Sequence, residues 1–219
     1  MMRTTFQTKI TVLATVVSAA IIAAVVITQK NNEPEPVAAD ERTAITVRED
    51  SHRLDTVEDG KVTLVEFLDF ECEACGAAYP VIEDLREQYE GRVTFVIRYF
   101  PIPSHTNAKN AAYAVESAAR QGKLEDMYRR MYDTQAEWGE SQDSKADLFR
   151  TYAEELGLDM AQFDADVSSP DVAARVQKDI DDGTKLGVSG TPSFFLNGEP
   201  LVPETVQDFT RAIDDALAS

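Results

Sequence analysis

The longest apolar run of the chain lies near its start. Residues 10–29 carry no charged side chain and are rich in Val, Ile and Ala. A helix of about 20 residues spans roughly 30 Å, the thickness of the hydrocarbon core of a bilayer. We therefore predict one N-terminal transmembrane helix over 10–29. A cleaved secretory signal is the alternative, but its apolar region would be shorter, about 7–15 residues, with a cleavage site close behind it.

The charges around this run predict its orientation. Arg3 and Lys9 precede it, and only Lys30 follows before acidic residues begin. By the positive-inside rule, residues 1–9 form a cytoplasmic N-terminus and the rest of the chain lies outside the cytoplasm. Residues 30–44 are polar, contain two prolines and show no hydrophobic periodicity, so we predict an extended linker there.

The folded part is expected over 45–219 and opens with a strand, a helix and a strand. Residues 62–68 and 92–100 are short runs of β-branched and aromatic side chains, as in buried strands. Residues 73–90 between them place apolar side chains at helical spacing, and Pro80 is expected to kink this helix.

A long helical region follows the second strand. Apolar side chains at helical spacing predict several helices, at 106–121, 123–135, 144–157, 159–167 and 170–186. The strand pattern returns at 192–196, where Asn197-Gly198 predicts a hairpin. A final helix is expected over 203–218.

Composition restricts the class of protein further. With 43% hydrophobic and 27% charged residues in 219, the chain is typical of a folded globular protein. A formal net charge of −18 argues against a nucleic-acid partner, because such proteins neutralise phosphates with basic side chains. Two cysteines are too few for a disulfide scaffold.

These two cysteines, Cys72 and Cys75, form a C-x-x-C pair where the first strand gives way to a helix. The first N–H groups of a helix lack partners within the helix and carry partial positive charge, so a thiolate is favoured at Cys72. Two thiols at this spacing can also close a disulfide and exchange it with a partner. We interpret the pair as a redox centre that needs no cofactor and no metal.

Three other uses of the pair remain open at this stage. A structural zinc site would need both cysteines together with His52 and His105, since the chain has no other Cys or His. A copper site could combine the pair with a distant histidine. A purely structural disulfide is the third alternative.

The sequence around the pair resembles the active-site segment of the DsbA-like branch of the thioredoxin superfamily, in Phe67-Leu68-Asp69-Phe70-Glu71-Cys72-Glu73-Ala74-Cys75. The segment 187–198 resembles the proline loop of that family, and Arg98-Tyr99-Phe100-Pro101 with His105 resembles its segment after the second strand. The resemblance implies an α/β thioredoxin-like fold with a helical insertion at about 104–187 and a cis Thr191-Pro192 bond. It points to a membrane-anchored bacterial type.

The resemblance also implies roles for individual residues. Cys72 is expected to attack and form a mixed disulfide, and the more buried Cys75 to resolve it. Thr191 and Pro192 are expected to border a peptide-binding groove. Glu66 matches a buried carboxylate that could move protons to Cys75, although the residue could also face solvent. For three other residues we expect a structural role only: His52, His105 and Trp138.

The function implied is that of an extracytoplasmic thiol:disulfide oxidoreductase donating its Cys72–Cys75 disulfide to secreted or envelope proteins with cysteine pairs. A membrane redox partner would recycle the pair. The alternatives are a disulfide reductase or isomerase and a copper-binding chaperone. Glu73-Ala74 replaces the Pro-His common between the cysteines of strongly oxidising members, so we predict a higher thiol pKa and a milder oxidant than those members.

Overall fold

The computed structural model describes residues 37–58 and 60–219. The predicted cytoplasmic segment 1–9, the predicted transmembrane helix 10–29 and residues 30–36 of the predicted linker lie outside these residues. No helix within the described part of the chain is long and apolar enough to cross a membrane.

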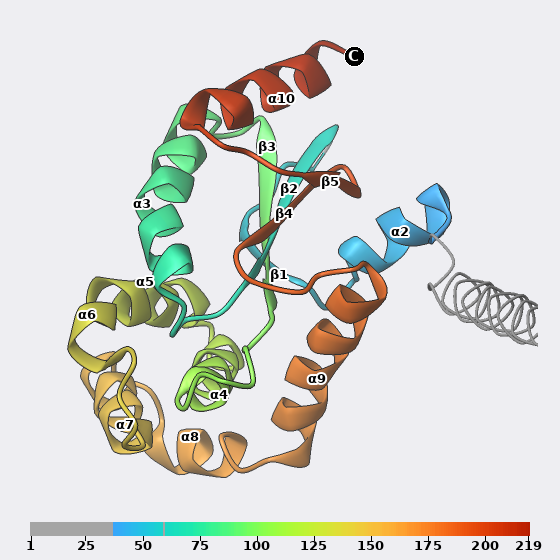
Figure 1. The fold of residues 1–219 in the computed structure, drawn as a ribbon. Coiled ribbons are helices and arrows are strands. Elements are labelled where there is room, and N and C mark those ends of the chain that lie inside the picture. Colours follow the sequence, from blue (N-terminus) through green and yellow to red (C-terminus); the bar gives the residue numbers. More distant parts are fainter. Residues whose placement is uncertain (1–36, 59) are drawn as a thin grey trace, which may run out of the picture. The chain divides into compact units, whose positions relative to one another are not determined.

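A five-stranded mixed sheet forms the centre of the fold, in the order β1-β3-β2-β4-β5 (Figure 1). The two runs predicted as buried strands are the parallel central pair, β2 (Val62–Leu68) and β3 (Val93–Tyr99). The other three are antiparallel to their neighbours: β1 (His52–Asp55), β4 (Ser193–Leu196) and β5 (Glu199–Leu201). The predicted hairpin joins β4 to β5, where Asn197 and Gly198 adopt φ of 51° and 84°.

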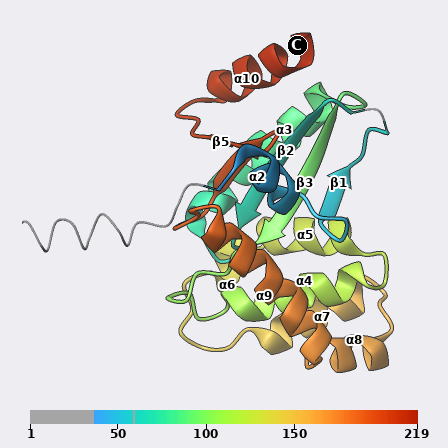
Figure 2. The ribbon, with the colours of Figure 1, turned by 90° about the vertical axis from the view of Figure 1, so that its right-hand side faces the viewer.

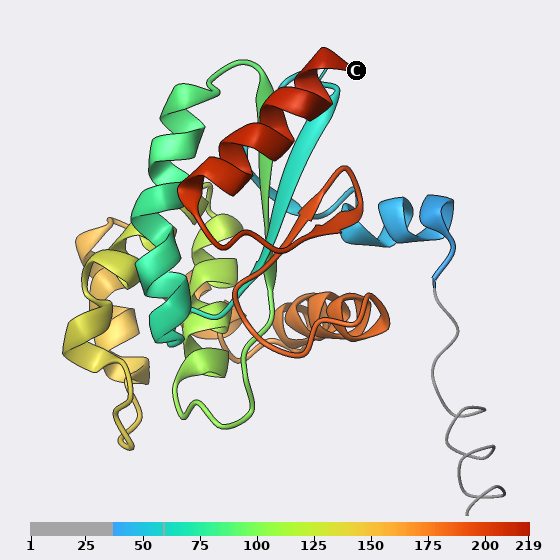
Figure 3. The same ribbon diagram turned by 45° about the horizontal axis from the view of Figure 1, so that its top comes forward.

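One face of the sheet is covered by α3 (Glu73–Gln88) and α10 (Val206–Ala218) (Figures 1 and 3). Leu85 of α3 and Ile213 of α10 pack with Leu64 of β2 in one buried apolar cluster. The helix α3 continues through Pro80. This packing fixes the start of α3, and with it the cysteine pair, at the carboxyl end of β2.

The opposite face is covered by α9 (Pro170–Lys185). The Ser169 hydroxyl caps this helix by accepting a hydrogen bond from Asp171 N, and Pro170 occupies its first turn. Ile180 packs against the cluster that contains Phe67 and Phe195. The predicted insertion range of 104–187 therefore includes one helix, α9, that belongs to the layers around the sheet.

The remaining helices gather at one end of the sheet around a buried core of their own (Figure 2). They are α4 (Ala108–Ala119), α5 (Leu124–Asp133), α6 (Gln135–Trp138), α7 (Ala146–Glu155) and α8 (Met160–Asp166). Trp138 is fully buried against Phe149 and donates its indole N–H to Met131 O at 3.3 Å, so it packs the core as expected. The α/β fold with a helical insertion is confirmed.

Two elements were not predicted from the sequence. Residues 39–44, assigned to the extended linker, belong to the helix α2 (Ala39–Thr46), so that assignment is wrong for them. The strand β1 was missed because all four of its residues are half-buried and show no alternation of apolar and polar side chains. The predicted helix 123–135 ends at Asp133, and α6 begins two residues later.

Candidate active site

Cys72 lies at the junction of β2 and α3, where it is the N-cap residue of α3 with φ −69° and ψ 121°. Its side chain is half-buried. A hydrogen bond from the Cys75 side chain lowers the pKa of Cys72 to about 5. The backbone N–H groups of Cys75 and Ala74 act in the same direction, while burial opposes them. The Cys72 sulfur is therefore a thiolate at neutral pH and accessible to a partner.

Cys75 has the opposite environment. It is fully buried one turn into α3, and Asp69 N lies 3.5 Å from its Sγ. Burial raises the pKa of Cys75, and the neighbouring Cys72 and Glu66 raise it further. Two thiols of one turn thus differ in both exposure and acidity, which separates an attacking sulfur from a resolving one.

Glu66, on β2, is 5% exposed, so the solvent-facing alternative is wrong. Burial raises the pKa of Glu66 to about 8, with a further contribution from Cys72. At neutral pH the carboxyl group is mostly protonated. The charge of Glu66 raises the pKa of Cys75, so the two buried groups are electrostatically coupled.

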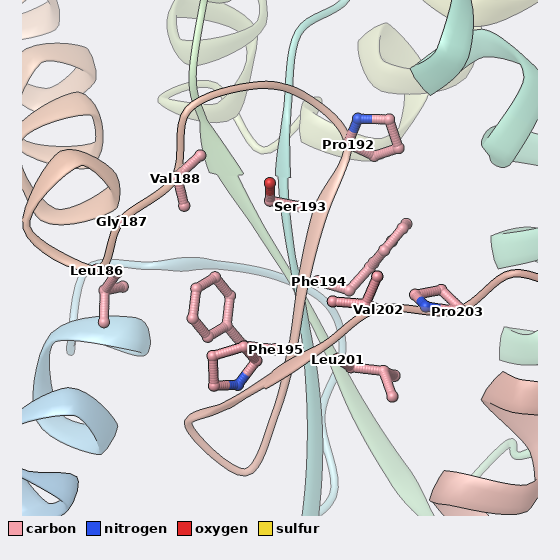
Figure 4. Close-up of a pocket in the computed structure, with 11 residues that line it drawn as sticks. Leu186, Gly187, Val188, Pro192, Ser193, Phe194, Phe195, Leu201, Val202 and Pro203 are labelled. Atoms are coloured by element: carbon pink, nitrogen blue, oxygen red, sulfur yellow. The ribbon is translucent and has the colours of Figure 1, made fainter.

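The loop before β4 contacts Cys72. Thr191-Pro192 is cis, as the resemblance implies, and Cys72 Sγ lies 3.3 Å from Thr191 O. Pro192 lines a pocket of about 420 Å³ together with Phe194, Leu201 and Val202 (Figure 4). Val202 is 86% exposed, so this pocket, which Pro192 borders, offers apolar surface to a partner.

Two buried carboxylates hold the active-site loop, and neither was identified as a site residue from the sequence. Asp69 accepts hydrogen bonds from Glu71 N, Ile102 N and His105 Nδ1, the last at 2.6 Å. Partial burial lowers the pKa of His105, but Asp69 outweighs it and raises that pKa. Glu71 accepts from Asn107 N at 2.5 Å. Both acids lie inside the motif that was recognised, yet their partners Ile102, His105 and Asn107, more than 30 residues away, were not deducible.

The structure does not assemble the alternative zinc site. His105 is engaged by Asp69, and His52 Nε2 lies 2.5 Å from Glu116 Oε2. Among residues 37–58 and 60–219, no three Cys, His, Asp or Glu side chains are grouped as metal ligands would be.

The comparison with protein families agrees with this geometry. The family model described as thioredoxin matches residues 57–215, most of the chain. The chain belongs to the thioredoxin family. A solved structure, a thioredoxin-like oxidoreductase from Silicibacter pomeroyi DSS-3, is 29% identical with a TM-score of 0.66, covering 78% of this chain and 95% of that one.

The fold of this thioredoxin-family chain is also that of DsbA-like proteins. The structure of alpha-DsbA1 from Wolbachia pipientis matches with a TM-score of 0.67 at 17% identity, covering 78% of this chain and 93% of that one. The sheet with its helical insertion therefore has a DsbA-like fold.

A curated relative carries a different name. The chain is 35% identical over 178 residues to a Na(+)/H(+) antiporter NhaA 1 of Mycobacterium sp. (strain KMS), a match that covers 79% of this chain and 27% of that protein. The chain spans about a quarter of the length of the curated relatives it matches. The antiporter name describes those longer proteins.

The acidity of Cys72 gives a pH prediction for this thioredoxin-family protein. In the reduced form, ultraviolet thiolate absorbance and alkylation should titrate with a midpoint near 5. Because this pKa is depressed on folding, ionisation of Cys72 stabilises the reduced form above the unfolded-state pKa of about 8.5, and this stabilisation is lost as pH falls through about 5. The unfolding temperature of the reduced form, relative to the oxidised form, should therefore fall as pH is lowered from 8 to 4. If the difference in unfolding temperature between the two forms did not change with pH, the low pKa assigned to Cys72 would be wrong.

A second prediction concerns proton transfer by Glu66. Glu66→Gln retains the shape but removes the proton carrier, so the step that involves Cys75 should slow by about 100-fold, the lower range for acid–base catalysis. Rapid-mixing kinetics with a fluorescent dithiol peptide would measure this step apart from the first attack at Cys72. Glu87→Gln, on the exposed side of α3, is the control and should leave both steps unchanged. Equal rates for the two variants would rule out proton transfer by Glu66.

Proposed function

We propose that this chain donates the Cys72–Cys75 disulfide to secreted or envelope proteins. The observation that carries the proposal is the low pKa of the accessible Cys72 beside the buried, protonated Cys75. A stabilised thiolate favours the reduced pair, and a dithiol that is stable when reduced is an oxidant when its sulfurs are joined. Disulfides donated in this way persist outside the cytoplasm, where the predicted anchor over 10–29 would hold the domain.

The reaction follows from the environment of each sulfur. A substrate thiolate attacks Cys72 Sγ in the disulfide, forming the mixed disulfide and releasing Cys75 as a thiolate. Cys75 then takes a proton, and we propose protonated Glu66 as its source. The second substrate thiolate then attacks the substrate sulfur of the mixed disulfide. The substrate leaves oxidised, and Cys72 leaves as the stable thiolate.

The substrate is proposed to be an extended segment of a protein. The peptide bond at Thr191, next to Cys72 Sγ, offers backbone groups for pairing with an added strand. The pocket bordered by Pro192 and Val202 would take an apolar side chain close to the substrate cysteine. After transfer, a membrane redox partner is proposed to reoxidise the pair, because the chain turns over only if its disulfide is renewed.

The reduction potential of the pair tests the direction of transfer. Equilibration with glutathione buffers should give a value between about −120 mV, as in strongly oxidising DsbA, and about −270 mV, as in thioredoxin. A value on the oxidising side of this range supports a donor. The carboxylate of Glu73 next to Cys72 favours the alternative, a reductase or isomerase, and a potential at or below that of thioredoxin would establish it in place of the donor.

A further inference from the structure

The helical insertion contacts the active-site turn through Gln135, the first residue of α6. Its side-chain Nε2 donates to Phe70 O at 2.7 Å and to Cys72 O at 2.9 Å. These two carbonyl groups flank the turn that leads from β2 into α3. A single amide, more than 60 residues further along the chain, therefore bridges the backbone on both sides of Glu71.

Gly76 provides a second, independent observation of this contact. A Cβ built on Gly76 would lie 1.9 Å from Gln135 Oε1, so only glycine leaves room for the amide. Gly76 N also donates to Cys72 O at 3.0 Å, and the same carbonyl thus accepts two hydrogen bonds. The first turn of α3 and the side chain of Gln135 are fitted to each other.

The backbone of Gln135 is itself held firmly. Thr134, the preceding residue, donates its hydroxyl to Arg130 O in α5 at 2.7 Å. At the other end of α6, Trp138 is fully buried in the core of the insertion. The amide is therefore presented by a packed framework and not by a free loop.

We propose that Gln135 is a positioning residue for Cys72, which it acts on by holding the carbonyl groups of Phe70 and Cys72. The inference rests on the proposed function of the cysteine pair. Fixing these carbonyls keeps Cys72 in its N-cap conformation, φ −69° and ψ 121°, at the start of α3, where the partial positive charge of the helix favours a thiolate. Through this contact the insertion tunes the reactivity of the nucleophile, in addition to covering the end of the sheet.

The consequence is measurable on the thiolate itself. Without the amide, the carbonyl of Phe70 loses this donor and that of Cys72 keeps only Gly76 N. The turn then moves more freely, and the Cys72 sulfur spends less time at the start of α3, where the helix dipole favours a thiolate. We expect the thiolate midpoint to rise by about one pH unit, so alkylation at the wild-type midpoint should slow about fivefold.

The test is a pH titration of the reduced full chain carrying Gln135→Leu, which keeps a similar volume and removes the donor. Gln142→Leu is the matched control, since the amide of Gln142 is exposed and only donates to Glu140 O at 3.4 Å. The control should titrate as wild type. If Gln135→Leu has the same thiolate midpoint as the control and only its unfolding temperature falls, Gln135 is a packing residue and the proposal is overturned.

Gly76→Ala is a second way to remove the Gln135 amide from the carbonyls of Phe70 and Cys72. It serves as the test if Gln135→Leu folds poorly. The added methyl group should push the amide away and raise the midpoint by a similar amount. Adding Gln135→Ala to Gly76→Ala should then change the midpoint little, because contacting residues are not additive. Fully additive shifts would overturn the proposal. These titrations use no substrate, so they stand whether or not the wild-type protein oxidises a peptide.

Discussion

Cys72→Ala will abolish disulfide exchange, whereas Cys75→Ala will leave a protein that forms a mixed disulfide and cannot release it. The difference follows from the two environments, because only Cys72 is accessible and has a pKa near 5, while Cys75 is buried and protonated. Incubation with a peptide disulfide and non-reducing mass spectrometry would measure both outcomes. We expect a covalent peptide adduct on Cys75→Ala and none on Cys72→Ala.

Both substitutions shorten the side chain by a single sulfur atom, so each is the control for the other. Near-native circular dichroism of both variants would show that the fold is retained. An adduct on Cys72→Ala would mean that Cys75 is the attacking sulfur, and the assignment of roles would be reversed.

The second large effect concerns stability. Arg98 is fully buried in β3 and donates to Asp179 Oδ1 at 2.5 Å, to Asp182 Oδ2 at 2.6 Å and to the carbonyls of Ile45 and Thr46. Arg98→Met keeps the apolar stem but leaves two carboxylates and two carbonyls with fewer donors. Breaking a buried ion pair in this way costs about 3–5 kcal/mol. Urea denaturation would measure the loss in the free energy of unfolding.

Arg150→Met is the matched control for Arg98→Met. Arg150 pairs with Asp164 in an exposed ion pair, which solvent screens, so Arg150→Met should lower the free energy of unfolding far less than Arg98→Met. Equal losses for the two variants would contradict the structural role assigned to Arg98.

The network around Arg98 also bears on the active site. Asp179 and Asp182 lie on α9, whose end leads through Leu186 into the loop with Thr191 and Pro192. Arg98 thereby joins β3, α9 and the end of α2, since Ile45 and Thr46 are the last residues of that helix. Loss of Arg98 should therefore loosen the loop that faces Cys72 as well as the sheet.

The elements that bury one apolar face were predictable from the sequence. Hydrophobic runs identified β2 and β3, and helical spacing identified most of the helices, because burial of those side chains is what forms the elements. The strand β1 and the helix α2 have no such pattern. Hydrogen bonds to β3 hold the first, and Arg42, bonded to Glu199 of β5, helps to hold the second, so neither could be read locally.

The same distinction applies to the site. Cys72, Cys75 and Glu66 were identified from a local motif, with Thr191 and Pro192 from a second one. Gln135 and the pairing of Asp69 with His105 depend on contacts between segments distant in sequence, and only the folded chain brings these together.

Anaerobic transfer of the disulfide to a reduced peptide with two cysteines tests the central claim most directly. Equal amounts of oxidised protein and reduced peptide would be mixed at neutral pH and quenched with acid. Mass spectrometry would then measure the masses of both. We expect the peptide to lose two hydrogen atoms while the protein gains two, in equal amounts. A protein that stays oxidised beside a fully reduced peptide would contradict it.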